Sequence, residues 1–299
     1  MSTITRIKGE IENPSFPILT PNGLKPYYLG IYENRLNEKG FVLSPSQEDA
    51  IGEFLDDISQ DEVVNHVRSF WPFVGSSTNK YAAKVPLIGN KEFDFDDSFA
   101  DFVFSGSDIV GISSTPATSL VGLDFFDEHK MCMGASLLKT ATQSSYNPQA
   151  INKIIDVGGC QYRPVQIDTQ YRQALYLRRS SGGGSPTYGV FSAPSGVDMT
   201  AAGHVYEIIG LNDHSVKPYY CRYNRNAGGE KARAAGIDTT YTYYLSDNDH
   251  INNPFTTCSY SYINAITGLF VFDKILTTSE MDAFIDALVK MNTALGRNV

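Results

Sequence analysis

The sequence predicts a mainly β protein: a sandwich of antiparallel sheets with short helices before it and one helix at its end. The composition is rich in Gly (25), Tyr (18) and Phe (17), and charged residues make up only 19% of the 299 residues. Aromatic residues favour strands, and glycine favours the tight turns between them. From about Pro72 onward, short apolar runs alternate with turn signals, which is typical of a β sandwich.

The first segment, residues 1–43, has no sustained hydrophobic period and is interrupted by turn signals such as Pro21-Asn22-Gly23. A segment of this kind cannot bury a core by itself. We expect an extended N-terminal attachment arm, which is either a frayed terminus or an arm ordered against a partner subunit.

Two short helices are predicted over residues 44–71, as a tether or oligomerisation element. Ser44-Pro45-Ser46-Gln47 forms a capping box with proline at the first helical position. Ser59-Gln60-Asp61-Glu62 forms a second capping box, and apolar residues follow it at helical spacing. Pro72 ends this second helix, because proline disfavours helix at the residue before it.

The remaining residues, 72–299, form the predicted β domain. Its strands are expected at Asp101–Ser105, Leu120–Phe126, Met131–Leu138, Lys153–Val157, Val165–Tyr171, Thr187–Phe191, His204–Leu211, Val216–Tyr223, Thr240–Leu245 and within Tyr260–Leu276. A third capping box, Thr277-Thr278-Ser279-Glu280, begins a helix over residues 278–295 with a narrow apolar stripe. We expect this helix to lie against the sandwich.

Two stretches of this domain resemble a module found in tailed-phage virion proteins. Phe70–Gly75 followed by Ala82–Leu87 resembles the opening of the module, and Gly268–Phe272 with the ending Leu295–Arg297 resembles the end of concanavalin A-like (laminin-G-like) jelly rolls. The stretch His204–Asn226 is similar to their hairpin. The resemblance extends from the second predicted helix to the C-terminus and implies a concanavalin A-like jelly roll over residues 72–299.

The same resemblance implies a structural virion protein of a tailed phage: a fibre, or a tail or head appendage. Residues 1–71 would bind other virion proteins, and the jelly roll would be displayed, with host-surface glycan as a further partner. Such a protein is made in the host cytoplasm and located in the virion. Because an extended arm gains order from partner copies, we also expect a homo-oligomer, with a trimer as the first hypothesis.

Charge and hydropathy exclude several other partners. The chain has 24 Lys and Arg against 33 Asp and Glu, a net charge of −9, which argues against nucleic acid. No window approaches 18 apolar residues, so no membrane span is expected, and the N-terminus lacks the apolar core of a signal peptide. Four isolated cysteines form no C-x-x-C pair and are expected to be reduced thiols.

Catalytic motifs are missing from the sequence. Gly182-Gly183-Gly184 lacks the lysine of a P-loop, and there is no G-x-S-x-G, H-E-x-x-H or E-x-D-x-E pattern. We therefore expect no enzymatic activity and no cofactor. The loop around Asp247 and Asp249 gathers oxygen ligands that a hard cation such as Ca²⁺ prefers, although turns rich in Asp and Asn commonly occur without an ion.

The candidate glycan-binding residues are aromatic, basic and amide side chains in the last third of the chain: Tyr219, Tyr220, Arg222, Tyr223, Asn224, Arg225 and Tyr243. Tyrosine and arginine give rigid contact area and are enriched on recognition surfaces. The alternative is that tyrosines at alternate positions fill the sandwich and send their hydroxyls to its rim. Two other functions stay open: a dedicated carbohydrate-binding module or lectin, and a polysaccharide depolymerase with carboxylates that the linear sequence does not reveal.

Overall fold

The fold was examined in a computed structural model. It describes residues 21–90, 92, 101–114, 131–139, 155–157, 160–167, 170–177, 187–192, 203–211, 219–223, 226–231 and 265–297. The predicted strands Leu120–Phe126 and Thr240–Leu245 lie outside these residues, as do residues 1–20 of the predicted arm. Among the described helices, none combines the length and apolarity needed to cross a bilayer.

The sequence predicted an extended N-terminal arm, but part of this region is helical. Residues Pro21–Glu38 form helix α1, which packs on α2. Tyr32 and Leu36 are fully buried in the core cluster, so tertiary packing stabilises a helix whose prolines indicated a break. Pro21 is compatible with this helix because proline is tolerated at the first helical position.

Helix α2 covers Pro45–Gln60 and confirms the first capping box. The Gln47 amide donates to Ser44 Oγ at 3.3 Å, and the Ser44 amide donates to Gln47 Oε1 at 3.0 Å. The predicted second helix is wrong. Glu62 has a φ of 58°, so the chain leaves the helical path there and forms a short 3₁₀ turn, η1 (Val63–His66), before strand β1 (Val67–Trp71).

Helix α3 covers Thr278–Ala294 and confirms the C-terminal helix together with its capping box. The Glu280 amide donates to Thr277 Oγ1 at 3.3 Å, and the Thr277 amide donates to Glu280 Oε2 at 2.7 Å. Lys274 also donates to Glu280 at 2.7 Å. The helix start is therefore determined by local chemistry that the sequence displays.

Two antiparallel sheets account for the described strands. In the larger one the order is β11-β10-β9-β4-β12-β3-β2, and β1 pairs with β12 beside β3. Its other strands are β2 (Asp101–Ser105), β3 (Asp108–Ser114), β4 (Met131–Lys139), β9 (Gly203–Leu211), β10 (Tyr219–Tyr223), β11 (Asn226–Lys231) and β12 (Ala265–Phe272). The predicted mainly β, antiparallel fold is confirmed, while the jelly-roll topology stays a prediction.

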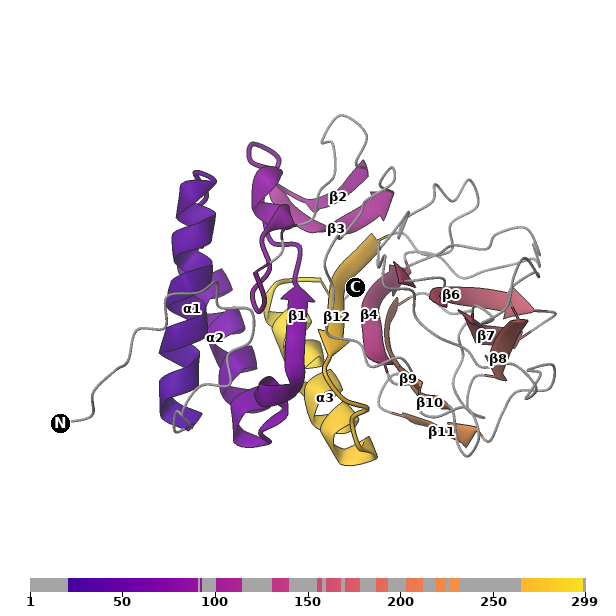
Figure 1. The fold of residues 1–299 in the computed structure, drawn as a ribbon. Coiled ribbons are helices and arrows are strands. Elements are labelled where there is room, and N and C mark those ends of the chain that lie inside the picture. Colours follow the sequence, from indigo (N-terminus) through magenta and orange to yellow (C-terminus); the bar gives the residue numbers. More distant parts are fainter. Residues whose placement is uncertain are drawn as a thin grey trace.

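The smaller sheet has the order β5-β6-β7-β8. Its strands are β5 (Ile155–Val157), β6 (Cys160–Ile167), β7 (Gln170–Leu177) and β8 (Thr187–Ser192). The single strand predicted at Val165–Tyr171 is wrong, because the chain reverses between Ile167 and Gln170, which face each other in the β6–β7 pair. In Figure 1, β6–β8 lie at the right and α1 and α2 at the left.

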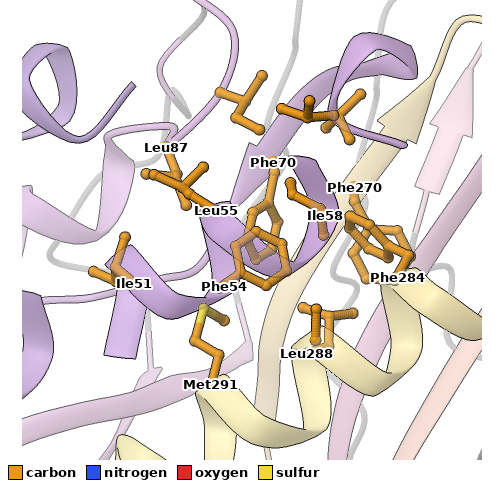
Figure 2. Packing of buried hydrophobic residues seen from close by; sticks show 14 of the residues in the cluster. Ile51, Phe54, Leu55, Ile58, Phe70, Leu87, Phe270, Phe284, Leu288 and Met291 are labelled. Atoms are coloured by element: carbon orange, nitrogen blue, oxygen red, sulfur yellow. The ribbon is translucent and has the colours of Figure 1, made fainter. Parts of the chain in front are cut away.

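The main core lies between α2, α3 and the β1–β12 pair. Four phenylalanines meet there from four elements: Phe54, Phe70, Phe270 and Phe284. The ring centroids of Phe284 lie 5.6 Å from Phe54 and 4.9 Å from Phe270, in edge-to-face arrangements. Figure 2 shows these rings with the aliphatic side chains of α2 and α3 around them. Helix α2 and strand β1, which lie in the segment predicted as a tether or oligomerisation element, are thus part of one core with the sheet.

Candidate functional site

The predicted glycan-binding residues fall partly within the described strands. Strand β10 contains Tyr219, Tyr220, Arg222 and Tyr223. It is an inner strand, because β9 pairs with it on one side and β11 on the other. Asn224, Arg225 and Tyr243 lie outside the described residues, as do the candidate ion ligands Asp247 and Asp249. The glycan site at these positions stays a prediction.

A different group of polar residues is brought together beneath the end of α3. It comprises Ser136 on β4, His204 on β9, Thr267 on β12, Asn292 on α3 and Arg297 after α3, and we call it the polar seam. All are buried except His204, which is half-buried. Buried polar groups are costly unless they are hydrogen-bonded, so the contacts within the seam decide what it can do.

The centre of the seam is a triangle of short hydrogen bonds. Ser136 Oγ lies 2.8 Å from His204 Nε2 and 2.5 Å from Thr267 Oγ1, and His204 Nε2 lies 2.8 Å from Thr267 Oγ1. Asn292 Nδ2 donates to Ser136 Oγ at 3.2 Å. The Tyr206 ring stacks on His204 with centroids 4.7 Å apart, and this contact fixes the plane of the imidazole.

The Ser136–His204 contact has the length of a nucleophile–base pair, but the count of hydrogens argues against that role. If His204 Nε2 were an acceptor, both hydroxyls would have to donate to it, and the 2.5 Å contact between Ser136 and Thr267 would contain no hydrogen. If Nε2 carries a hydrogen, every contact is satisfied. His204 then donates to both hydroxyls, Ser136 donates to Thr267, and Thr267 donates to the Ser136 carbonyl at 3.2 Å.

This assignment makes His204 a donor toward Ser136. A histidine nitrogen that carries a hydrogen cannot remove the serine proton, so the Ser136–His204 hydrogen bond has a structural role in this arrangement. The full burial of Ser136 agrees with this, since a nucleophile must meet its substrate. In the described part of the chain, no three His, Cys, Asp or Glu side chains gather as a metal site would require.

Arg297 anchors the second half of the seam. Its Nη1 donates to the carbonyls of Pro72 at 2.7 Å and Thr267 at 3.1 Å, and its Nη2 to those of Phe73 at 3.1 Å and Ile109 at 3.2 Å. Burial lowers the pKa of the Arg297 guanidinium to about 10. None of the described carboxylates forms an ion pair with it; the four carbonyl dipoles contact the guanidinium directly, and Asp108 favours its charged form from a greater distance.

The four carbonyls meet at a break in the sheet. Strands β1 and β3 both pair with the same edge of β12, β1 along its C-terminal half and β3 at Ile266. Between these pairings the β12–β4 register shifts at Thr267, which is the extra residue of a β-bulge. Carbonyls at such a break lack ladder partners, and the planar fork of an arginine can satisfy several of them at once.

The turn after α3 delivers Arg297 into this break. Gly296 has a φ of 68°, its amide donates to Thr293 O at 3.0 Å, and the Arg297 amide donates to Asn292 O at 2.8 Å. These two bonds form a Schellman motif, which reverses the chain at a left-handed glycine. The sequence indicated Leu295–Arg297 only as part of a family resemblance. The signal for the anchor was an arginine directly after a helix-ending glycine.

Comparisons with known proteins found limited similarity. No protein-family model matches the chain, and no curated protein matches it in sequence. Three solved structures illustrate what it is similar to. For Trypanosoma rangeli sialidase in complex with sialic acid, the identity is 9% and the TM-score 0.42, over 75% of this chain and 33% of that one.

For the binding domain of paraclostridial mosquitocidal protein 1, the identity is 10% and the TM-score 0.44, over 74% of this chain and 52% of that one. For the enzymatically active domain of tailspike protein 2 from bacteriophage CBA120, the identity is 11% and the TM-score 0.29, over 60% of this chain and 25% of that one. The chain thus spans about half or less of each protein's length, and at these TM-scores the similarities decide nothing about its activity.

Proposed function

We propose that the chain is a structural protein of a tailed-phage virion, a fibre or a tail or head appendage, which displays its β domain and contacts host glycan. The observation that supports this proposal is the meeting of the two stretches that resemble virion proteins. Residues of Phe70–Gly75 and Gly268–Phe272 pair as β1 and β12. Arg297, from the ending Leu295–Arg297 of the second stretch, donates to carbonyls of Pro72, Phe73 and Thr267.

Stretches 200 residues apart in sequence therefore build one unit around one buried charge. Two parts of one module are expected to pack together in this way, whereas two chance sequence similarities are not. The hydrogen count that makes His204 a donor toward Ser136 supports a structural rather than a catalytic role for this pair. Since α2 and β1 belong to the core, we place attachment to other virion proteins on residues 1–38, which include the outer face of α1.

The first test is the content of the particle. Purified particles of the phage that encodes the chain should contain it at a fixed copy number by quantitative mass spectrometry, and antibodies raised against it should label one site in electron micrographs. Presence of the chain in the lysate and its absence from the particles would contradict the proposal.

The second test separates contact with glycan from cleavage. The full-length chain is incubated with host-surface polysaccharide, and retention and newly formed reducing ends are measured together. Retention without new reducing ends is expected. Release of reducing ends would instead identify a depolymerase. Light scattering of the same sample tests the proposed homo-oligomer, which a monomer at micromolar concentration would contradict.

A further inference from the structure

Helix α1 packs on the outside of the described core. In Figure 1 it is the outermost helix at the left, and its neighbour is α2. Tyr32 and Leu36 are fully buried members of the main core, and Tyr28 and Leu29 pack against it. Because a helix that contains a proline, here Pro26, is unstable alone in water, α1 depends on these contacts.

Polar contacts join α1 to the stretch of chain between β1 and β2. Arg35 Nη1 donates to Gly89 O at 2.5 Å. Asn79 Nδ2 donates to Lys39 O at 2.6 Å, and Lys39 Nζ pairs with Glu92 Oε2 at 2.8 Å. We call the face of α2 under α1, together with Asn79, Gly89 and Glu92, the α1 seat. It matches α1 in both apolar and polar groups, so the partner that fits it is an α1 helix.

The connection between α1 and α2 reverses the chain at Gly40. Gly40 has a φ of 73°, its amide donates to Asn37 O at 2.8 Å, and the Phe41 amide donates to Leu36 O at 2.9 Å. These two bonds form a Schellman motif, and residues 41–44 after it belong to no helix or turn. Since glycine also adopts negative φ without strain, rotation at Gly40 converts the reversal into an extended segment.

The side chains after Gly40 have the pattern of a strand. Phe41 and Leu43 are buried, whereas Val42 between them is 77% exposed. Alternation of this kind is typical of an extended segment with one covered face, and phenylalanine and valine favour strands over turns. We call residues 40–43 the hinge. An extended hinge keeps Phe41 and Leu43 on the core and presents Val42 to a second copy.

Exchange of α1 between two copies preserves the described contacts of the seat, because the same groups meet across the two chains. The four residues of the hinge span about 13 Å when extended, which separates α1 from its own α2. The exchange gives up the two Schellman bonds at Gly40 and covers Val42 between the two hinges. Short hinge loops favour such exchange, which is a low-cost route to dimers.

We propose that two copies of the chain exchange α1, so that each α1 occupies the seat on the other copy and the two hinges meet at Val42. This inference rests on the homo-oligomer of the proposed function and names its interface. Two copies close the exchange, so a dimer is expected rather than a trimer. Incorporation into particles and retention by glycan are measured separately, so each can fail alone.

Carbodiimide cross-linking of the native full-length chain tests the exchange. The reagent joins an ammonium group to a paired carboxylate as an amide, with loss of water. The pair Lys39–Glu92 connects α1 to its seat, so in the exchanged form it links two chains. The matched control is the pair Lys290–Asp57, which joins α3 to α2 within one copy and has the same 2.8 Å separation.

Denaturing electrophoresis separates covalent dimer from monomer, and mass spectrometry identifies the links in each band. The Lys39–Glu92 link should occur in the dimer band and be absent from the monomer band, whereas the Lys290–Asp57 link should occur in both. Lys39→Gln should remove most of the covalent dimer, and Lys290→Gln should leave it unchanged.

Two hinge variants should shift the balance in opposite directions. Insertion of Gly-Ser-Gly after Val42 lets α1 fold back on its own seat more easily and should lower the yield of covalent dimer by about tenfold or more. Gly40→Val disfavours the left-handed turn and should raise the share of dimer that survives dilution. Both changes lie at exposed positions, and circular dichroism spectra and melting temperatures check that the variants fold.

Each contrary result has a distinct meaning. A chain that is monomeric by light scattering at micromolar concentration would overturn both the exchange and the homo-oligomer. An oligomer whose Lys39–Glu92 link stays in the monomer band would overturn the exchange alone and place the contact between copies on another surface. Equal yields of covalent dimer from the wild type and the insertion variant would also contradict the exchange, because the length of the hinge would then have no effect.

Discussion

Helix α3 contributes to two buried regions, the apolar core and the polar seam, which are stabilised by different kinds of interaction. Its middle contributes Phe284 and Leu288 to the apolar core, and its end contributes Asn292 and the following Arg297 to the polar seam. Contacts in the core are non-directional and scale with the area removed from water. Contacts in the seam depend on a fixed number of donors and acceptors at fixed angles. The core should therefore tolerate changes of shape, and the seam should not tolerate the loss of a single donor.

The largest effect is expected at Arg297. Arg297→Met keeps most of the side-chain length but leaves four buried carbonyls without this donor. Since a buried acceptor that loses its partner costs about 1–3 kcal/mol, the free energy of unfolding should fall by about 4 kcal/mol or more. The free energy of unfolding of Arg297→Lys should lie between those of the wild type and Arg297→Met, because a single ammonium cannot reach both sides of the break. Urea unfolding measures all three proteins, and a loss below about 1 kcal/mol in Arg297→Met would show that water replaces the guanidinium.

The next largest effect belongs to the core. Phe284→Ala removes a fully buried ring that touches Phe54, Phe70, Phe270 and Phe272. The expected loss is about 3–4 kcal/mol from transfer and cavity terms. Phe284→Leu should lose only about 1–1.5 kcal/mol, since cores accept apolar side chains of similar volume. If Phe284→Leu were as damaging as Phe284→Ala, the core would be as directional as the seam and the comparison would break.

A smaller effect is expected in the centre of the seam. Ser136→Ala removes the acceptor of Asn292 and His204 and should lower the free energy of unfolding by about 2 kcal/mol. Ser59→Ala is the matched control. Ser59 is also buried, but its hydroxyl only adds a second bond to Leu55 O within α2, so its loss should cost about 0.5 kcal/mol or less. Chemical denaturation compares the two variants.

The tautomer of His204 can be tested directly. In the folded protein, His204 Nε2 should be protonated in long-range ¹H–¹⁵N spectra, and a fluorophosphonate probe should leave Ser136 unlabelled. Labelling of Ser136 in the wild type and its loss in Ser136→Ala would instead show an activated serine. The seam would then be a catalytic site.

Local chemistry explains which elements the sequence could predict. The helix starts at Ser44 and Thr277 were predictable because each capping box lies within four residues. Strand β1 was not, because Val67–Trp71 has apolar residues at helical spacing and becomes a strand only by pairing with β12, about 200 residues later. Helix α1 was missed for the same reason, since packing on α2 stabilises it.

The seam was still harder to predict. Its members at positions 136, 204, 267, 292 and 297 come from four segments, and only Asn292 and Arg297, at the end of α3, are close in sequence. Thr267 faces the seam because of a β-bulge, and a bulge depends on the register of the neighbouring strand. Arg297 lies in the ending that resembles concanavalin A-like jelly rolls and His204 begins the stretch similar to their hairpin, but neither resemblance indicated a polar network. A site built from backbone carbonyls leaves little trace in side-chain motifs.

The smallest effect on stability is expected from the ionisation of a buried group, which the core and the seam accommodate differently. The seam holds the charged Arg297 because carbonyls surround it, whereas the core holds Cys132 as a thiol: burial raises the pKa of Cys132 from 9.0 to about 12. A folded-state pKa above the unfolded value gives stability that is complete below pH 9 and is lost as the pH rises through 12. From near pH 8 to pH 10 this group alone should cost about 1.4 kcal/mol.

Comparison with Cys132→Ala isolates the thiol among the described groups that lose stability in alkali, because the other groups titrate alike in both proteins. Burial also raises the pKa of Tyr28, Tyr32 and Tyr206, whose unfolded value is 10.0, so their loss of stability begins near pH 10 and continues above it. The lowered pKa of Arg297 acts in the opposite sense and in the same higher range. Cys132→Ala should therefore be less stable than the wild type near pH 7 but lose less of its stability between pH 8 and pH 10. If urea unfolding showed the same loss of stability between pH 8 and pH 10 for both proteins, water would reach Cys132. The apolar core would then not be dry beside the seam.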